Sequence, residues 1–388
     1  MSVRHVVLFT AIGLVLFLCS PMTIEAHQPI VGKEIQELEK RSTLDVERFS
    51  NDDAIRGIYV SSHSAGSKRF QSLLSLIDES DLNAMVIDIK DDYGNVTYDP
   101  GHSSTYNDIA TNYIQDLNYV MEELEAHHVY PIARIVVFKD SLLANKKPEL
   151  SFTNENGDVW LNGRGEAFVN PFLEDVWHHN LMIAKEAAKA GFKEIQFDYV
   201  RFPEGFETRD LELDYSVGNY DRFERVQAVT DFVSFAKKEL EPFNVDVSVD
   251  LFGYATVEQE SAGIGQNFSR IAESVDVISS MIYPSHWSGN FGIEAPDTMP
   301  YELISAYAKV ETERLNELSS PPITRPWIQD FTASWLGEGN YIPYGSTEVE
   351  AQIQALHDHG IDEYLIWNAG NTYSEGTNYA PKRNYSTK

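Results

Sequence analysis

The sequence of 388 residues contains a single cysteine, Cys19. An intramolecular disulfide framework and a cysteine zinc cluster both need more than one thiol, so the chain excludes them. Positive charge is also scarce, since 30 Lys and Arg residues stand against 60 Asp and Glu residues and the formal net charge is −30. A surface of this sign repels phosphate backbones and anionic lipid head groups. We therefore expect no nucleic-acid partner and no membrane attachment through a basic patch.

The first 26 residues differ from the rest of the chain. Arg4 and His5 precede an apolar run of 14 residues at 6–19, and Ala26 ends the polar stretch that follows. This order is typical of a secretory signal peptide, and the run is shorter than the roughly 20 residues of a membrane-spanning helix. We expect cleavage after residue 26 and a secreted or extracellular protein. The alternative is an uncleaved N-terminal anchor, which is the one predicted route to a membrane and to the cell surface.

The body of the chain alternates strand-like and helix-like segments. Hydrophobic residues make up 43% of the sequence, which is enough for a large core. A mostly polar spacer at 27–54 is followed by eight β-rich runs, and the gaps between these runs are long enough for helices. This order predicts a single-domain α/β fold of the (β/α)₈ TIM-barrel type over 55–375. A tail at 376–388 follows the predicted domain. An open doubly wound sheet is the competing fold, but its glycine-rich turn after the first strand is missing. The predicted strands are 56–60, 84–90, 130–138, 193–200, 245–253, 275–284, 324–331 and 363–369.

Several gaps show the helical period of apolar residues, which supports the barrel. The four stripes are Phe70, Leu73, Leu74 and Ile77; Ile114, Leu117, Met121 and Leu124; Val226, Val229, Val233 and Leu240; and Val349, Ile353 and Leu356. Segments 140–170, 202–220 and 285–300 have no clear period and follow predicted strands 3, 4 and 6. Long loops at strand ends are where barrels carry their functional sites.

Alternation along the strands predicts which carboxylates face the barrel interior. In strand 4, Ile195, Phe197 and Tyr199 share one face, and an apolar face should pack outward on the helices. Asp198, on the other face with Gln196 and Val200, then points inward near the carboxyl end. In strand 5 the outward residues are Val247, Val249 and Leu251, which leaves Ser248 and Asp250 inward. Two carboxylates are thus predicted at one level on adjacent strands.

Glycoside hydrolysis needs such a pair, because one carboxyl group protonates the leaving oxygen while the other attacks the anomeric carbon or activates water. Asp198 and Asp250 fit these roles by position. Strand 2 places Asp88 and Lys90 inward by the same alternation, and strand 3 contributes Arg134 or its neighbours. The alternative is that each aspartate caps a loop or pairs with an arginine such as Arg201.

Aromatic residues gather in and after the last three predicted strands. They are Trp287, Trp327, Trp335 and Trp367, with Tyr254 and Tyr283 nearby. Sugar rings stack on aromatic faces, so this distribution suits a glycan-binding rim. Ordinary core packing is the alternative, because aromatic residues are also good core material.

The sequence lacks the motifs of metal-dependent hydrolases, serine hydrolases and nucleotide-binding proteins. The histidine pairs at 127–128, 178–179 and 357/359 fall on predicted helices or their ends, and no His-Glu-x-x-His spacing is present. We expect no metal and no cofactor. A Gly-x-Ser-x-Gly elbow and a Walker loop are also absent from the sequence.

Three segments resemble a known family. They are PIARIVVFKD at 131–140, Asn170-Pro171, and EIQFDYVRFP at 194–203. Together they resemble the glycoside hydrolase-like domain of secreted and surface proteins from Bacillus-like bacteria, over about residues 55–375. That family is placed among TIM-barrel glycosidases related distantly to α-amylase and polygalactosaminidase types. The resemblance implies a nucleophile after strand 4, matching Asp198, and an acid/base on strand 5, where many relatives carry Glu and this sequence has Asp250.

The sequence therefore predicts an exported glycoside hydrolase that acts on a bacterial extracellular or cell-wall polysaccharide. Its catalytic residues are predicted to be Asp198 and Asp250. A non-catalytic glycan-binding barrel and a hydrolase of another kind, such as a deacetylase, remain alternatives, and no oligomeric state is indicated. The predicted substrate-binding residues are Asp88, Lys90, Arg134, Arg201, Tyr254, Tyr283, Trp327, Trp367 and Asn368.

Overall fold

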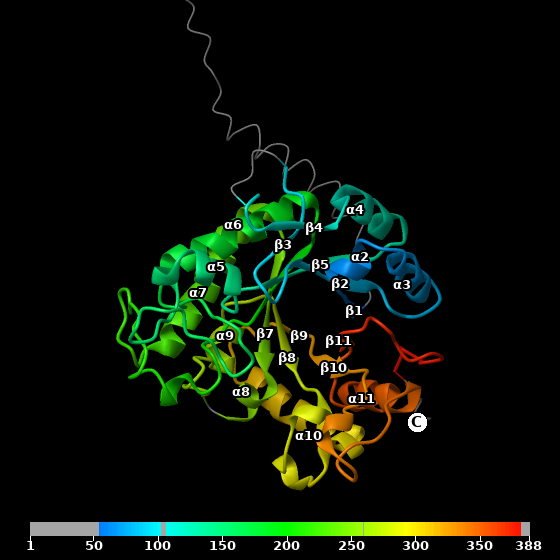
Figure 1. The fold of residues 1–388 in the computed structure, drawn as a ribbon. Helices are drawn as coiled ribbons and strands as arrows, with labels where there is room; N and C mark the ends of the chain where they lie inside the picture. The colour runs from blue at the N-terminus through cyan, green and yellow to red at the C-terminus, as the bar shows by residue number, and fades with distance from the viewer. Residues whose placement is uncertain (1–53, 102–105, 259, 382–388) are drawn as a thin grey trace, which may run out of the picture.

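The computed structural model describes residues 54–101, 106–258 and 260–381. Eight parallel strands form a closed barrel at its centre, with helices around it (Figure 1). The fold is a (β/α)₈ TIM barrel, as the sequence predicts. The barrel strands are β1 (Arg56–Val60), β2 (Ala84–Lys90), β5 (Tyr130–Val136), β6 (Glu194–Asp198), β7 (Asp246–Phe252), β8 (Val277–Met281), β10 (Trp327–Gln329) and β11 (Tyr364–Trp367).

The barrel closes because β1 pairs with both β2 and β11. Gly57 lies opposite Ala84 of β2 and opposite Leu365 of β11. A Cβ at Gly57 would lie 2.8 Å from the Leu365 side chain, so a glycine allows this close packing at the junction. On the other side of the barrel, β6 and β7 pair in register, with Phe197 opposite Val249.

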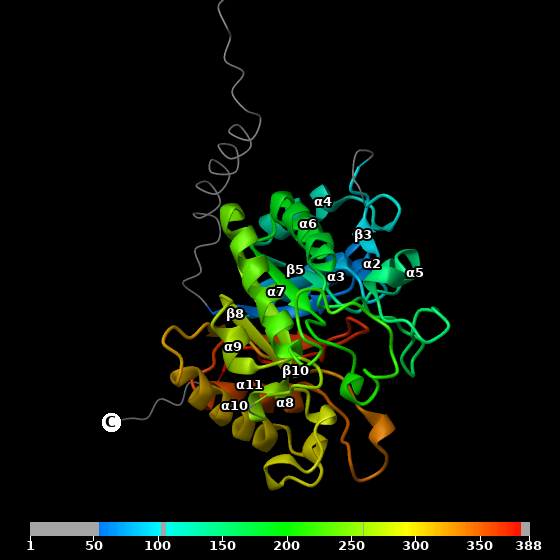
Figure 2. The ribbon, with the colours of Figure 1, turned by 90° about the vertical axis from the view of Figure 1, so that its left-hand side faces the viewer.

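Helices connect successive strands and cover the outside of the barrel. Figure 2 shows two of them, α6 and α7, side by side on one flank. Their apolar stripes face the strands; Phe70, Leu73, Leu74 and Ile77 of α3, for example, are all buried. The main helices are α3 (Arg69–Asp78), α4 (Leu117–Ala126), α6 (Glu174–Ala190), α7 (Arg225–Leu240), α9 (Phe268–Ala272), α10 (Pro300–Asn316) and α11 (Ser346–Asp358).

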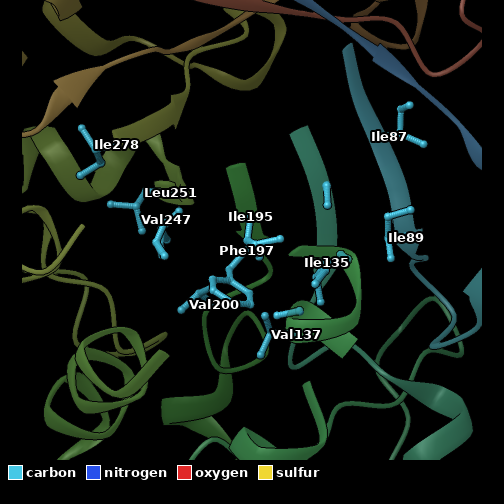
Figure 3. Close-up of a cluster of buried hydrophobic side chains, with 14 of the residues drawn as sticks. Ile87, Ile89, Ile135, Val137, Ile195, Phe197, Val200, Val247, Leu251 and Ile278 are labelled. Atoms are coloured by element: carbon cyan, nitrogen blue, oxygen red, sulfur yellow. The ribbon is translucent and has the colours of Figure 1, made fainter. Parts of the chain in front are cut away.

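The outward faces of the strands form one continuous apolar layer under the helices. Figure 3 shows side chains of β2, β5, β6, β7 and β8 in this layer, including Ile87, Phe197 and Leu251. The alternation predicted for the second and fifth strands, which are β2 and β7, agrees with this arrangement, because Ile87 and Ile89 of β2 and Val247, Val249 and Leu251 of β7 lie in the layer. A second, smaller cluster, which includes Tyr59, Trp327 and Leu365, lies among the closing strands.

The fourth predicted strand, at 193–200, is β6 in the structure, and its carboxyl end differs from the prediction. Alternation places Tyr199 outward and Val200 inward, but β6 ends at Asp198 and Tyr199 adopts a left-handed backbone with φ +53°. This turn reverses the order of the two side chains: Val200 packs in the outer core, and Tyr199 lines a pocket. A left-handed conformation is rare for a bulky residue, and such outliers gather at functional sites.

Three strands were missed. β3 (Val96–Tyr98) and β4 (Ala110–Ile114) form an extension on β2 between the second barrel strand and α4, and β9 (Ile323–Thr324) pairs with β8. Ile114 therefore belongs to a strand and not to the helical stripe predicted with Leu117. Within the described ranges, the chain after β11 forms turns, and no helix covers the barrel after its last strand.

The predicted signal peptide at 1–26, and the predicted spacer at 27–54 apart from Ala54, lie outside the described residues, as does the tail after 381. No helix in the described part of the chain combines the length and the hydrophobicity needed to cross a bilayer.

Candidate active site

A pocket of about 670 Å³ opens at the carboxyl ends of the barrel strands. Its walls come from β5, β6, β7, β8, β10 and β11, from the loops that follow these strands, and from Asp92 after β2. This end of the barrel is where TIM barrels hold their active sites. Eight of the residues predicted from the sequence line this pocket together. They are Arg134, Asp198, Arg201, Asp250, Tyr254, Tyr283, Trp327 and Trp367.

Asp198 ends β6 and is surrounded by hydrogen-bond donors. The Nε and Nη2 atoms of Arg134 donate to its Oδ2 at 3.0 and 2.5 Å, and the backbone N–H of Tyr199 donates to its Oδ1 at 2.6 Å. An ionised carboxylate only accepts hydrogen bonds, and paired arginine N–H groups match its geometry. The site therefore holds Asp198 in one orientation.

Asp250 lies on the neighbouring strand in a different environment. Its side chain is buried, and its Oδ1 accepts a hydrogen bond of 2.8 Å from Nε1 of Trp327. Among the described residues, no cation forms a salt bridge with it. Burial, with the nearby charge of Asp198, raises the pKa of Asp250 well above its ordinary value. The two carboxyl groups thus differ: paired N–H donors orient Asp198, whereas burial favours the protonated form of Asp250.

Arg134 owes its position to a second carboxylate behind it. Its Nη1 donates to Asp88 Oδ1 at 2.7 Å, and Asp88 Oδ2 accepts from the hydroxyl of Tyr59 at 2.5 Å. Burial raises the pKa of Asp88 to about 6, although the Arg134 charge opposes this shift. The Tyr59 ring stacks on Trp367 at 4.1 Å between centroids, so the first and last barrel strands both support this network.

Three predicted substrate-binding residues lie outside the pocket lining. Asp88 contacts Arg134, as described above. Lys90 is fully buried, where its Nζ lies 2.7 Å from both Asp140 Oδ2 and the carbonyl oxygen of Val136. Asn368 donates from its Nδ2 to the carbonyl oxygens of Asp330 and Thr372. These contacts assign Lys90 and Asn368 to supporting the strand ends and loops, and leave no free polar group on Lys90 for a sugar.

The pocket also contains residues that the sequence did not single out. Tyr199 enters through the left-handed turn, and His286 follows β8 in the short helix η4 (Pro284–His286). Burial lowers the pKa of His286, so this side chain is neutral. The other additions include Asp92, Arg164, Glu204, Glu207, Glu258, Glu260 and Phe331, and Trp287 of the predicted aromatic rim also lines the pocket. Most come from loops whose irregular sequence gives no periodic signal.

The pocket is acidic. Its lining contains seven Asp and Glu residues and three Arg residues. Two of the arginines are already paired, Arg134 with Asp198 and Arg201 with Glu204 at 3.2 Å. The three cations Lys90, Arg134 and Arg201 would make a cleft less acidic if they were free at its surface. The structure does not support that arrangement, because all three side chains are buried against acidic or carbonyl partners.

Within the described ranges, no group of three or more His, Cys, Asp or Glu side chains is arranged to hold a metal ion.

The family model described as "putative glycosyl hydrolase domain" matches residues 57–373. The chain belongs to this family. Family membership identifies it as a glycosyl hydrolase and confirms the enzyme class expected from the sequence. A search of curated proteins found no match.

One solved structure supports the fold, and two others are similar at lower TM-scores. The glycoside hydrolase domain of PgaB (BpsB) from Bordetella bronchiseptica matches with a TM-score of 0.56 and 16% identity, covering 81% of this chain and 94% of that one. A hypothetical protein from Ruminiclostridium thermocellum is 30% identical over 50% of this chain and 96% of its own, with a TM-score of 0.44. The spore cortex-lytic enzyme SleL of Bacillus megaterium is 13% identical, covers 83% and 73%, and has a TM-score of 0.46.

Proposed function

We propose that the protein is exported and hydrolyses glycosidic bonds in a bacterial extracellular or cell-wall polysaccharide. Asp198 acts as the nucleophile or base, and Asp250 acts as the acid. The observation that carries this proposal is the difference between the two carboxyl groups within one pocket: Asp198 accepts three N–H donors, and buried Asp250 accepts one from Trp327. Two carboxyl groups in one pocket, of which burial favours the protonated form of Asp250, can supply the acid and the nucleophile or base of glycoside hydrolysis.

The surrounding groups suit a sugar ring bound between the carboxylates. Tyr283, Trp327 and Trp367 supply aromatic faces, and Tyr254 stacks on Trp287 at 4.4 Å on the wall after β7. Arg134 orients Asp198, while Arg201 lies over the rings of Tyr199 and Phe252 at 4.9 and 4.5 Å. Export rests on the signal-like composition of residues 1–26.

A non-catalytic glycan-binding barrel would be favoured by an arginine that neutralises both carboxylates. Arg134 instead joins Asp198 to Asp88, and the described residues include no arginine that contacts Asp250. Among the described residues Asp250 thus has no salt-bridge partner beside the oriented Asp198, which supports catalysis over binding alone.

The test is hydrolysis of a polysaccharide panel by the wild type, Asp198→Asn and Asp250→Asn. We expect both variants to lose activity by several orders of magnitude on polysaccharide. Asp250→Asn should retain more activity on aryl glycosides, because a good leaving group departs without proton donation. If either variant kept full activity on a glycan that the wild type cleaves, the corresponding role would be wrong. Circular dichroism and thermal melting of each variant confirm that the loss does not come from unfolding.

A further inference from the structure

Trp335 is unusually exposed for so large an apolar side chain. It lies in the short helix η7 (Ser334–Leu336) that follows β10, and 65% of its surface is accessible. Its ring stacks on Phe331 with centroids 5.9 Å apart and planes inclined by 20°. Trp335 belongs to neither of the two buried apolar clusters, so folding does not account for its position. An exposed aromatic face fixed by one stacking contact is a feature of binding surfaces.

The stack is continuous with the active-site pocket. Phe331 lines the pocket, and its ring lies 6.0 Å from that of Tyr283, which in turn lies 6.5 Å from Trp367. Tyr283 is near the reacting carboxyl groups, since burial and the charges of Asp250 and Asp198 raise its pKa. A ladder of four rings, Trp367, Tyr283, Phe331 and Trp335, therefore leads from the catalytic pair to the surface.

The first three rings of this aromatic ladder are buried or half-buried and can contact only what enters the pocket. Trp335 lies beyond the pocket lining and presents its free face to solvent. Its loop is held in place, because the carboxylate of Asp330 accepts from the backbone and hydroxyl of Ser374, and Tyr344 N–H donates to Thr332. A pre-positioned ring binds a ligand without the entropic cost of ordering a loop.

We propose that Trp335 is a distal sugar-binding subsite, where a pyranose unit of the polysaccharide stacks while another unit of the same chain occupies the pocket. This inference rests on the proposed function, since it names the occupant as the glycan that the pocket cleaves. It further implies that the enzyme prefers polymers to short oligosaccharides, because only a longer chain reaches Trp335.

The experiment measures how KM depends on chain length for Trp335→Ala and Trp335→Tyr. The substrates are a short and a long oligosaccharide of the glycan that the wild type cleaves. We expect Trp335→Ala to raise the ratio of the long-chain KM to the short-chain KM roughly three- to tenfold, the effect of losing one stacking contact. Trp335→Tyr should restore most of the preference. The matched control is Phe223→Ala, since Phe223 is 75% exposed and lies outside the pocket lining.

Binding is measured separately from cleavage by affinity electrophoresis in gels that contain amylose, hydroxyethyl cellulose, glycol chitin or glycol chitosan. Slower migration of the wild type than of Trp335→Ala in one of these gels supports the subsite, even if the wild type cleaves none of them and the proposed function fails. Equal retardation, an unchanged KM ratio, or no retardation in any gel overturns the subsite. A change in molecular mass on sedimentation of Trp335→Ala would also overturn it, because the ring would then bind a second copy of the protein.

Discussion

The chemistry at Asp250 has a cost in stability. Its raised pKa means that the folded protein binds this proton more tightly than the unfolded chain does. By linkage, the stability gained is fully present below the ordinary carboxyl pKa and is lost as pH rises toward the folded pKa. Above the ordinary carboxyl pKa, Asp250 therefore opposes folding, because the unfolded chain releases this proton more readily than the folded protein does.

Asp250→Asn should therefore be more stable than the wild type at pH 8, although it is inactive on polysaccharide. Asparagine keeps an oxygen that accepts from Trp327 and has no proton to lose. We expect the Tm difference between variant and wild type to grow from pH 4.5 to pH 8 in thermal melts. Asp108→Asn, which removes a surface ion pair with Lys146, serves as the control. A difference that is constant across this range would contradict the role of Asp250 ionisation.

In the proposed mechanism Asp88 is a positioning residue, because it is linked to Asp198 through Arg134. Asp88→Asn should lower kcat about tenfold to a hundredfold, the loss expected when a catalytic group is misplaced, and leave KM nearly unchanged. The wild type should also lose activity below about pH 6, where protonation of Asp88, whose pKa is about 6, removes the anion that holds Arg134. The measurement is kcat against pH for both proteins; a variant that keeps the same fall near pH 6 would assign that titration to another group.

At single positions, the sequence predicts side-chain direction as long as the strand stays regular. It places Asp198 and Asp250 in one pocket because β6 and β7 alternate without a break up to these residues. The predicted direction is wrong at Tyr199, because its left-handed backbone reverses the alternation. Tyrosine has no preference for this conformation, so the sequence does not indicate the turn. It also predicts Lys90 as a substrate-binding residue, but Lys90 is buried and paired with Asp140, which comes from a distant part of the sequence.

At the scale of elements, strand register predicts the stereochemistry. Phe197 pairs with Val249, so the next residues, Asp198 and Asp250, lie level on strands about 4.8 Å apart. Carboxyl groups separated by about 5–5.5 Å retain the anomeric configuration, whereas inversion needs about 6.5–9.5 Å. We expect retention, with Asp198 as the nucleophile. Proton NMR of the first-formed sugar decides this, and an inverted anomer would instead make Asp198 the base for a water.

Barrel elements were easier to predict than those added to the barrel. All eight barrel strands overlap the predicted runs, because buried parallel strands are dense in apolar and β-branched residues. β3 and β4 have only three and five residues, and β4 is mostly half-buried, so neither produces a distinct pattern. Pocket residues on loops, such as Glu207 and His286, were missed for the same reason.

Across the whole molecule, the net charge of −30 and the acidic pocket act in the same direction. An anionic glycan is repelled both on approach and in the pocket, and this repulsion is screened by salt. We expect a carboxymethylated form of the cleaved glycan to have a higher KM than the uncharged form, and the gap to shrink at about 0.5 M NaCl, where the Debye length falls to about 4 Å. Steady-state kinetics at two salt concentrations measure this. A salt-independent gap would point to steric exclusion of the carboxymethyl groups.

Because β1 closes the barrel by pairing with β11, the active site can form only after β11 has been synthesised. Asp198 and Asp250 are synthesised well before Trp327, which donates to Asp250, and roughly 170 residues separate Asp198 from Trp367, whose ring backs Tyr59. At about 5–20 residues per second, a ribosome needs roughly ten to thirty seconds for that stretch. A nascent chain therefore carries Asp198 for that interval, and both carboxylates for the part of it after Asp250, without an assembled site, so the enzyme cannot cleave sugars until its last barrel strand is made.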